Sequence, residues 1–234
     1  MKREFFYQDD RSNKFWTVGV EGSVVVTTNG RIGAKPKETR KAHANPAAAE
    51  REAEKLIAAK LKAGYREGAI AEAPAHQKPD WGTMAMSETV FWRIIKLFNW
   101  KKTGDDDAVL EPALVALAQM PVENIEKFEA ILAEKLFALD TEAHARNTGE
   151  DAYVDDVPYF SVDTFLYARC VVVANGEEFF RKVLADPTAM PKDMEFESLL
   201  YLSGSAYARK TGSEFEYHPP ADYETFSNKA GWGA

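Results

Sequence analysis

The first 43 residues carry short apolar segments in which aromatic and β-branched side chains predominate. Three such segments, bounded by Glu21-Gly22 and Asn29-Gly30, lie at residues 4–8, 14–20 and 23–28. Such residues favour extended backbone, and a polar residue followed by glycine is typical of a turn. The pattern therefore predicts three strands. A charged fourth strand is expected within residues 35–43, ending near Lys41, with Pro36 at an edge or turn.

A helical pattern begins at Asn45-Pro46. Asn is a favourable N-cap residue, Pro suits the first helical turn, and Gly64 provides a stop. One face of the segment between them is apolar and consists of Ala49, Ala53, Leu56, Ile57 and Leu61. Residues 1–70 are therefore predicted to form an α+β domain, a small antiparallel sheet with one helix.

The remainder of the chain has a different character. Residues 71–85 lack periodicity and carry Pro and Gly, which is typical of a linker. Apolar residues then recur at three- and four-residue steps and predict a mostly α-helical second domain over residues 86–211. Its helices are expected at residues 87–100, 105–117, 121–146, 161–174, 177–184 and 193–210. Residues 212–234 are predicted to be an irregular C-terminal tail.

Charge is distributed unevenly between the two domains. The 234 residues hold 29 Lys and Arg against 37 Asp and Glu, a formal net charge of −8. Residues 1–80 carry +4 and the remainder −12, while residues 11–46 alone carry +5. This asymmetry indicates modules with separate partners, and the acidic half is unfavourable for binding a polyanion.

Cysteine content and hydropathy restrict the cellular setting. With Cys170 alone, the chain has no intrachain disulfide and no Cys-based zinc site of its own. A reducing compartment, most simply the cytoplasm, fits this composition. Cys170–Ala174 is among the longest purely apolar runs, far short of the roughly 20 residues of a membrane span. No membrane partner is therefore expected.

Motifs in the first domain occur in the order found in WGR domains. They are Ser12-Asn13-Lys14-Phe15-Trp16, then Asn29-Gly30-Arg31-Ile32-Gly33, the Ala-rich helix, and Lys60–Tyr65. Residues 4–67 thus resemble a WGR domain, a module found in poly(ADP-ribose) polymerases and many bacterial proteins, for which nucleic-acid binding is proposed. The family is named for a Trp-Gly-Arg triplet, whereas this chain has Asn29 at the Trp position. In relatives that bind DNA ends, the aromatic residue at this position is thought to pack on the terminal nucleotide. Asn29 cannot supply that stacking contact.

Arg31 matches the arginine of the family and is the first candidate for nucleic-acid contact. A guanidinium can bind a phosphate through two nitrogens, although Arg31 could instead pair with an acidic residue of its own domain. Further candidates for backbone contacts are Lys14, Lys35, Lys37, Arg40 and Lys41, and Arg11 adds to the local charge. Such contacts release counterions and read no sequence, so the predicted binding is weak, salt-sensitive and sequence-independent.

The second domain resembles an uncharacterised bacterial helical family known as a domain of unknown function. The resemblance covers residues 86–211 and rests on Met86–Trp92, Asp163-x-Phe165-x-x-x-Arg169, Gly176 and Leu184–Pro187. It implies a helical fold and no mechanism. Asp163 is expected to cap its helix while Arg169 faces a neighbouring element. The functional alternative is a pocket in which Trp92, Asp163 and Arg169 bind a small anionic ligand.

No catalytic or metal-binding motif is evident elsewhere. His43, His76, His144 and His218 are scattered, and the acidic clusters at 105–107 and 151–156 lack the ligand spacing of a calcium loop. Cys170 is expected to be a buried, unreactive thiol. The chain is therefore expected to be non-enzymatic, without cofactor or metal.

Two functions remain open at this point. The first is a regulatory protein whose basic domain contacts nucleic-acid backbone weakly while its acidic helical domain engages a protein or small ligand. The second is a protein–protein interaction or immunity-type adaptor that does not bind nucleic acid. An enzyme with its pocket in the helical domain is a third reading, since the resembling family implies no mechanism.

Overall fold

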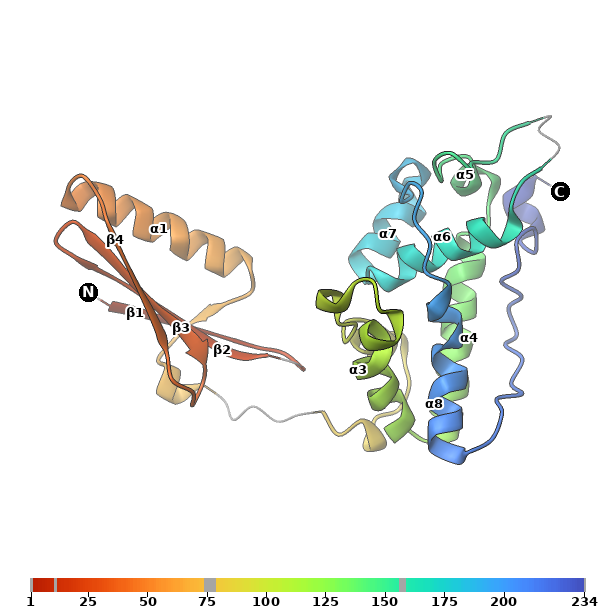
Figure 1. Cartoon of the computed structure of the whole chain (residues 1–234), viewed down its shortest axis with the longest axis horizontal. Coiled ribbons are helices and arrows are strands. Elements are labelled where there is room, and N and C mark those ends of the chain that lie inside the picture. The colour runs from red at the N-terminus through yellow and green to blue at the C-terminus, as the bar shows by residue number, and fades with distance from the viewer. Residues whose placement is uncertain (1, 11, 74–78, 156–158, 234) are drawn as a thin grey trace. The chain divides into compact units, whose positions relative to one another are not determined.

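The computed structural model describes residues 2–10, 12–73, 79–155 and 159–233 (Figure 1). The chain divides into two compact units, Met1–Pro79 and Asp80–Ala234. Each unit has its own cluster of buried apolar side chains. The division falls within the predicted linker, of which residues 74–78 lie outside the described part of the chain.

The first unit is the predicted antiparallel sheet with one helix. Its strands are β1 (Lys2–Gln8), β2 (Asn13–Glu21), β3 (Val24–Arg31), β4 (Lys37–Ala42) and β5 (Arg66–Glu67), in the spatial order β4-β3-β2-β1-β5. Helix α1 (Pro46–Lys62) lies across one face of the sheet (Figure 1). The two-residue β5 was not expected from the sequence, because it is too short to show any alternation.

Local signals at both ends of α1 are confirmed. The Asn45 side chain accepts a hydrogen bond from the Ala48 amide at 2.9 Å, and Gly64 has a φ of +85° that side chains disfavour. Three helix residues pack against four sheet residues to form the core, which contains Ala49, Ala53, Ile57, Phe5, Trp16, Val18 and Val25. Leu61, expected on the apolar face, is instead exposed, since the packed part of the helix ends before its last turn.

The second unit is helical, as predicted. It contains α2 (Glu88–Ile95), α3 (Asp106–Gln119), α4 (Val122–Ala138), α5 (Glu142–Ala145), α6 (Val162–Ala174), α7 (Glu177–Ala185) and α8 (Leu202–Thr211). Helix α8 packs on α3 and α4, and α6 packs on α4 and α7 (Figure 1). One continuous apolar core joins these helices.

Some predicted helix boundaries are wrong. The expected helix over residues 121–146 is divided, because α4 ends at Ala138 and the Thr141 side chain caps the separate α5. The last predicted helix does not begin at Asp193, which has a left-handed φ of +53° and accepts a hydrogen bond from the Glu150 amide. A 3-10 helix over Glu197–Tyr201 leads into α8 instead. Ser161, rather than the expected Asp163, caps α6.

The tail after α8 has little regular structure, as predicted, but two buried charged side chains fix its path. Asp140, at the end of α4, is fully buried and accepts hydrogen bonds from the tail. The donors are the backbone amides of Phe226 at 3.2 Å and Asn228 at 2.9 Å and the indole nitrogen of Trp232 at 2.9 Å. A carboxylate with three donors is well compensated for burial.

Arg169 holds the preceding part of the tail. It is fully buried in α6 and donates to the carbonyl oxygens of Leu136 and Tyr223 and to the Thr225 hydroxyl, each at 2.9 Å. Burial lowers the pKa of Arg169 to about 10, an effect that the Asp140 carboxylate opposes. The guanidinium thus remains charged at neutral pH and links α4, α6 and the tail.

Replacing Arg169 with Met should destabilise the helical unit by about 3 kcal/mol or more, because it leaves two carbonyls and a buried carboxylate without their cationic partner. Urea unfolding followed by tryptophan fluorescence measures this, since Trp81, Trp92, Trp100 and Trp232 all belong to this unit. Arg181→Met is the matched control, because Arg181 is an exposed arginine of the same unit that pairs with Glu177 at the surface. Equal effects of the two substitutions would contradict the role assigned to Arg169.

Candidate nucleic-acid interface

Strand register brings three of the predicted contact residues onto one face of the sheet. Lys14 of β2 lies opposite Arg31 of β3, and in the next row Asn29 lies between Trp16 and Lys37. Paired residues, and residues two apart on one strand, share a face of the sheet. Lys14, Arg31 and Lys37 therefore lie on the same face as Trp16, the face that α1 partly covers.

These cations are available for a ligand. Lys14, Arg31 and Lys37 are exposed, as is Lys35 in the loop between β3 and β4. Within the described part of the chain, no acidic side chain forms an ion pair with any of them. Among the described side chains, Arg31 therefore does not form the alternative ion pair with an acid of its own domain.

The end of α1 adds a cation that was not predicted. Lys60 Nζ lies 5.6 Å from the centre of the Trp16 ring and 4.6 Å from that of Tyr65. Because Trp16 neighbours Asn29 in the sheet, Lys60 borders the same row. We call Lys14, Arg31, Lys35, Lys37 and Lys60 the basic corner. Its position in the last turn of the predicted helix could have indicated Lys60 as a candidate contact residue.

The other predicted contact residues lie elsewhere. Arg40 is on the opposite face of the sheet, where it pairs with Glu21 and with Glu38, the latter at 3.4 Å. Lys41 lies at the far end of the sheet and pairs with Glu52 at 3.8 Å. Arg11 is outside the described residues. The seven basic residues of the local +5 segment thus do not form one continuous face.

The chemistry of the basic corner is ionic rather than aromatic. Asn29 occupies the exposed centre of the row and offers an amide in place of a ring. Tyr7 of β1 lies opposite Lys14, at the edge of the basic corner. Its hydroxyl donates a hydrogen bond to the Asp9 carboxylate at 2.6 Å, and this bond raises the pKa of Tyr7 to about 12. The arrangement suits phosphate groups, which take bidentate hydrogen bonds from Arg and single contacts from Lys.

Trp92, Asp163 and Arg169, the alternative ligand pocket of the helical domain, have separate surroundings in the described part of the chain. Trp92 is buried in the core, where its ring contacts Phe91 and Phe180, and Arg169 is fully buried and bound to the tail. Asp163 is exposed in the first turn of α6. A pocket lined by all three would have to expose two side chains that serve the fold.

The other side chains considered for chemistry in the sequence, Cys170 and His144, are buried in the helical domain. Burial raises the pKa of the Cys170 thiol to about 12, so the thiol is protonated and unreactive at neutral pH. His144 is buried between Thr141 and the Val183 carbonyl, and His76 lies outside the described residues. The described side chains bring no three His, Cys, Asp or Glu residues together as metal ligands. None of the helices in the described ranges is both long and apolar enough to span a membrane.

Two family models match this chain, and they correspond to the two structural units. Residues 2–72 match the WGR domain, so the protein has an N-terminal WGR domain that is followed by a helical domain. Residues 86–209 match the family described as protein of unknown function (DUF4240). Since this second match covers more than half of the chain, the protein belongs to the DUF4240 family.

Two proteins of Escherichia coli K12 each match this chain over 67 residues, about the length of one domain. The chain is 43% identical over 67 residues to the uncharacterized protein YfeS and 40% identical over 67 residues to the protein YehF. Each match covers 29% of this chain and 28% or 24% of the relative, respectively. A crystal structure of a Bacteroides fragilis protein is 27% identical, with a TM-score of 0.32, and the alignment covers 56% of this chain and 40% of that one.

Removing the Arg31 side chain should leave the WGR domain intact. Because Arg31 is exposed and unpaired among the described residues, Arg31→Ala is expected to change the free energy of unfolding by less than about 0.5 kcal/mol. Thermal unfolding followed by circular dichroism checks this. A loss above about 1 kcal/mol would show instead that Arg31 supports the sheet.

Proposed function

We propose that this protein binds the nucleic-acid backbone through the basic corner of its WGR domain, weakly and without reading sequence. The observation that carries the proposal is the strand register, by which Lys14, Arg31 and Lys37 share one sheet face, with no ion pair to an acid of the described residues. WGR domains are often linked to nucleic-acid binding, which agrees with this use of the face. Phosphate contacts of this type account for most non-specific nucleic-acid affinity.

The proposal also assigns the protein a regulatory rather than a catalytic part. The WGR domain would hold the protein near nucleic acid in the cytoplasm, while the acidic helical domain engages a second partner. The separate cores and the opposite charges of the two domains support this division of roles. The candidate groups for catalysis, including Cys170 and His144, are used in packing.

Salt-dependent binding tests the proposal directly. We expect the anisotropy of fluorescently labelled blunt and nicked duplexes to rise with full-length protein at roughly 50 mM salt and much less at roughly 200 mM, because counterion release drives the binding. Arg31→Ala should weaken binding and lower the salt slope by about one phosphate contact.

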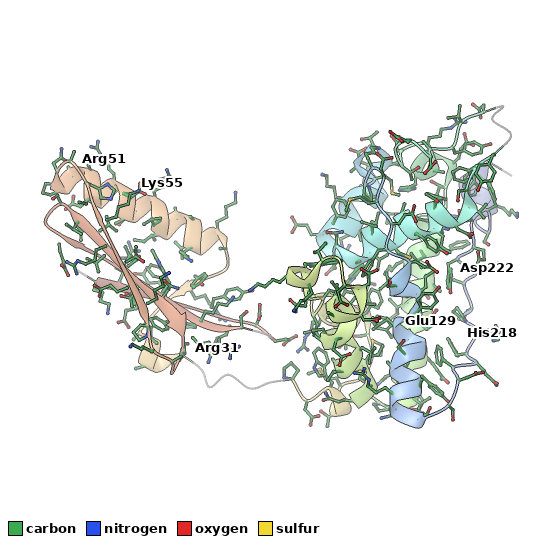
Figure 2. The ribbon with its side chains drawn as sticks, viewed as in Figure 1. Arg31, Arg51, Lys55, Glu129, His218 and Asp222 are labelled. Carbon is green, nitrogen blue, oxygen red and sulfur yellow. The ribbon has the colours of Figure 1, made fainter. Side chains whose placement is uncertain are left out.

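Arg51→Ala is the matched control for this experiment. Arg51 is an exposed arginine on α1, away from Arg31 at the end of β3 (Figure 2), so the substitution makes the same change in charge outside the basic corner. Equal losses for the two variants would show that only net charge matters. Absence of binding at low salt would favour the adaptor function, in which Asn29 has removed the nucleic-acid contact.

Restoring an aromatic residue at position 29 should create a preference for DNA ends. Asn29 is exposed and adjoins Arg31 and Trp16, so a Trp side chain there would present a stacking surface. Base–aromatic stacking contributes about 1–3 kcal/mol, so Asn29→Trp should favour a blunt duplex over one closed by hairpins at both ends by at least about fivefold. Anisotropy competition between the two duplexes measures the ratio, and equal affinities would rule out end stacking at this site.

A further inference from the structure

A solvent-open cavity of about 560 Å³ lies on the surface of the helical domain. Its walls come from α4, from α8 with the residues just before it, and from the tail segment 214–223. Phe215 packs on Tyr207 of α8 at 5.1 Å between ring centres, which holds the tail beside this helix. The cavity is within the usual size range of small-ligand sites.

A buried carboxylate borders this cavity. Glu129 of α4 is only 6% exposed, and among the described residues its Oε2 has no hydrogen-bond partner. Burial raises the pKa of Glu129, and a side-chain hydrogen bond from Ser203 of α8 opposes that rise only in part. A buried carboxyl with one unsatisfied oxygen is costly, and a bound cation would offset that cost.

The other walls are aromatic and acidic. Four aromatic residues line the cavity, namely Tyr201, Phe215, Tyr217 and Tyr223, together with the carboxylate of Glu214. No Lys or Arg is among the described lining residues, and His218 is the one basic side chain there. Figure 2 shows Glu129 in the helical domain and His218 and Asp222 on the tail. Aromatic faces and carboxylates both attract organic cations.

We propose that this cavity binds an alkylammonium group, with Glu129 as its counter-ion and the aromatic rings around its carbon chain. The ammonium could belong to a free small amine or to a lysine side chain of a partner protein, because both present the same chemistry. The net charge of −12 over residues 81–234 favours the approach of either one. The site does not depend on nucleic-acid binding by the WGR domain.

A titration of the isotope-labelled full-length chain tests this site. Butylammonium chloride and N-acetyl-lysine-N-methylamide are the cationic probes, 1-butanol is the neutral analogue, and ionic strength is held constant with sodium chloride. We expect saturable amide shifts around Glu129, residues 203–208 and residues 214–218 with both cations and none with butanol. Tighter binding of the lysine derivative would identify a protein side chain as the natural ligand, and tighter binding of butylammonium a free amine.

Glu129→Gln separates the ionic contact from simple cavity filling. This variant should bind both cations at least about tenfold more weakly, since a hydrogen bond to a charged group is lost. Glu134→Gln, an exposed position on the same helix, should leave the affinity unchanged. The fold should tolerate Glu129→Gln, because the Oε2 atom has no partner to lose.

Phe215→Leu provides a second, independent variant, because it keeps an apolar side chain but removes the ring. It should weaken cation binding severalfold. The proposal is overturned if neither cation gives saturable shifts, if butanol binds as tightly as butylammonium, or if Glu129→Gln retains the original affinity. None of these outcomes bears on the binding of nucleic acid by the basic corner, so the two proposals fail separately.

Discussion

The helical domain depends on the burial of two opposite charges, Asp140 and Arg169, at the junction of α4, α6 and the tail. Between them they bind the tail at Tyr223, Thr225, Phe226, Asn228 and Trp232. Apolar packing is non-directional and would tolerate many paths for a segment without regular structure. Hydrogen bonds to buried charges allow few paths for such a segment, because a buried charge without its hydrogen-bond partners is costly in a medium of low dielectric constant. The position of the tail, and with it one wall of the cavity beside Glu129, follows from this pair.

The WGR domain illustrates a different constraint, the coverage of a sheet by a helix. The core extends along the sheet from Val25 to Trp16, and beyond Trp16 the same face continues as the basic corner. Some cations elsewhere in the domain are paired, such as Arg3 with Glu54 and Glu67 and Arg40 with Glu21 and Glu38. What distinguishes the candidate binding face is that its cations lie together on adjacent rows of one sheet face.

The sequence predicts those features that arise from local physics. The ends of α1 follow from Asn45 and Gly64, and the helical character of the second domain follows from apolar periodicity. The orientation of the cations is not local, because Lys14 meets Arg31 only through the register of a hairpin, and Arg40 points away for the same reason. Arg169 signalled burial by standing among apolar residues of α6, yet its partners Tyr223 and Thr225 are more than 50 residues away. Glu129 gave a signal that was missed, since it lies at helical spacing from Ile125 and Leu132 on the apolar face of α4.

The late position of the tail contacts has a consequence for biosynthesis. A ribosome releases the WGR domain first, and that domain has its own core and can fold while translation continues. The helical domain cannot complete its folding during translation, because Asp140 and Arg169 leave the ribosome long before Phe226, Asn228 and Trp232. During that interval two charges that end up buried are held by water, and the aromatic residues that finally cover them are still in the exit tunnel. Nascent chains stalled before residue 232 would therefore carry a finished first domain and an unfinished second one, a state that chaperones and proteases recognise.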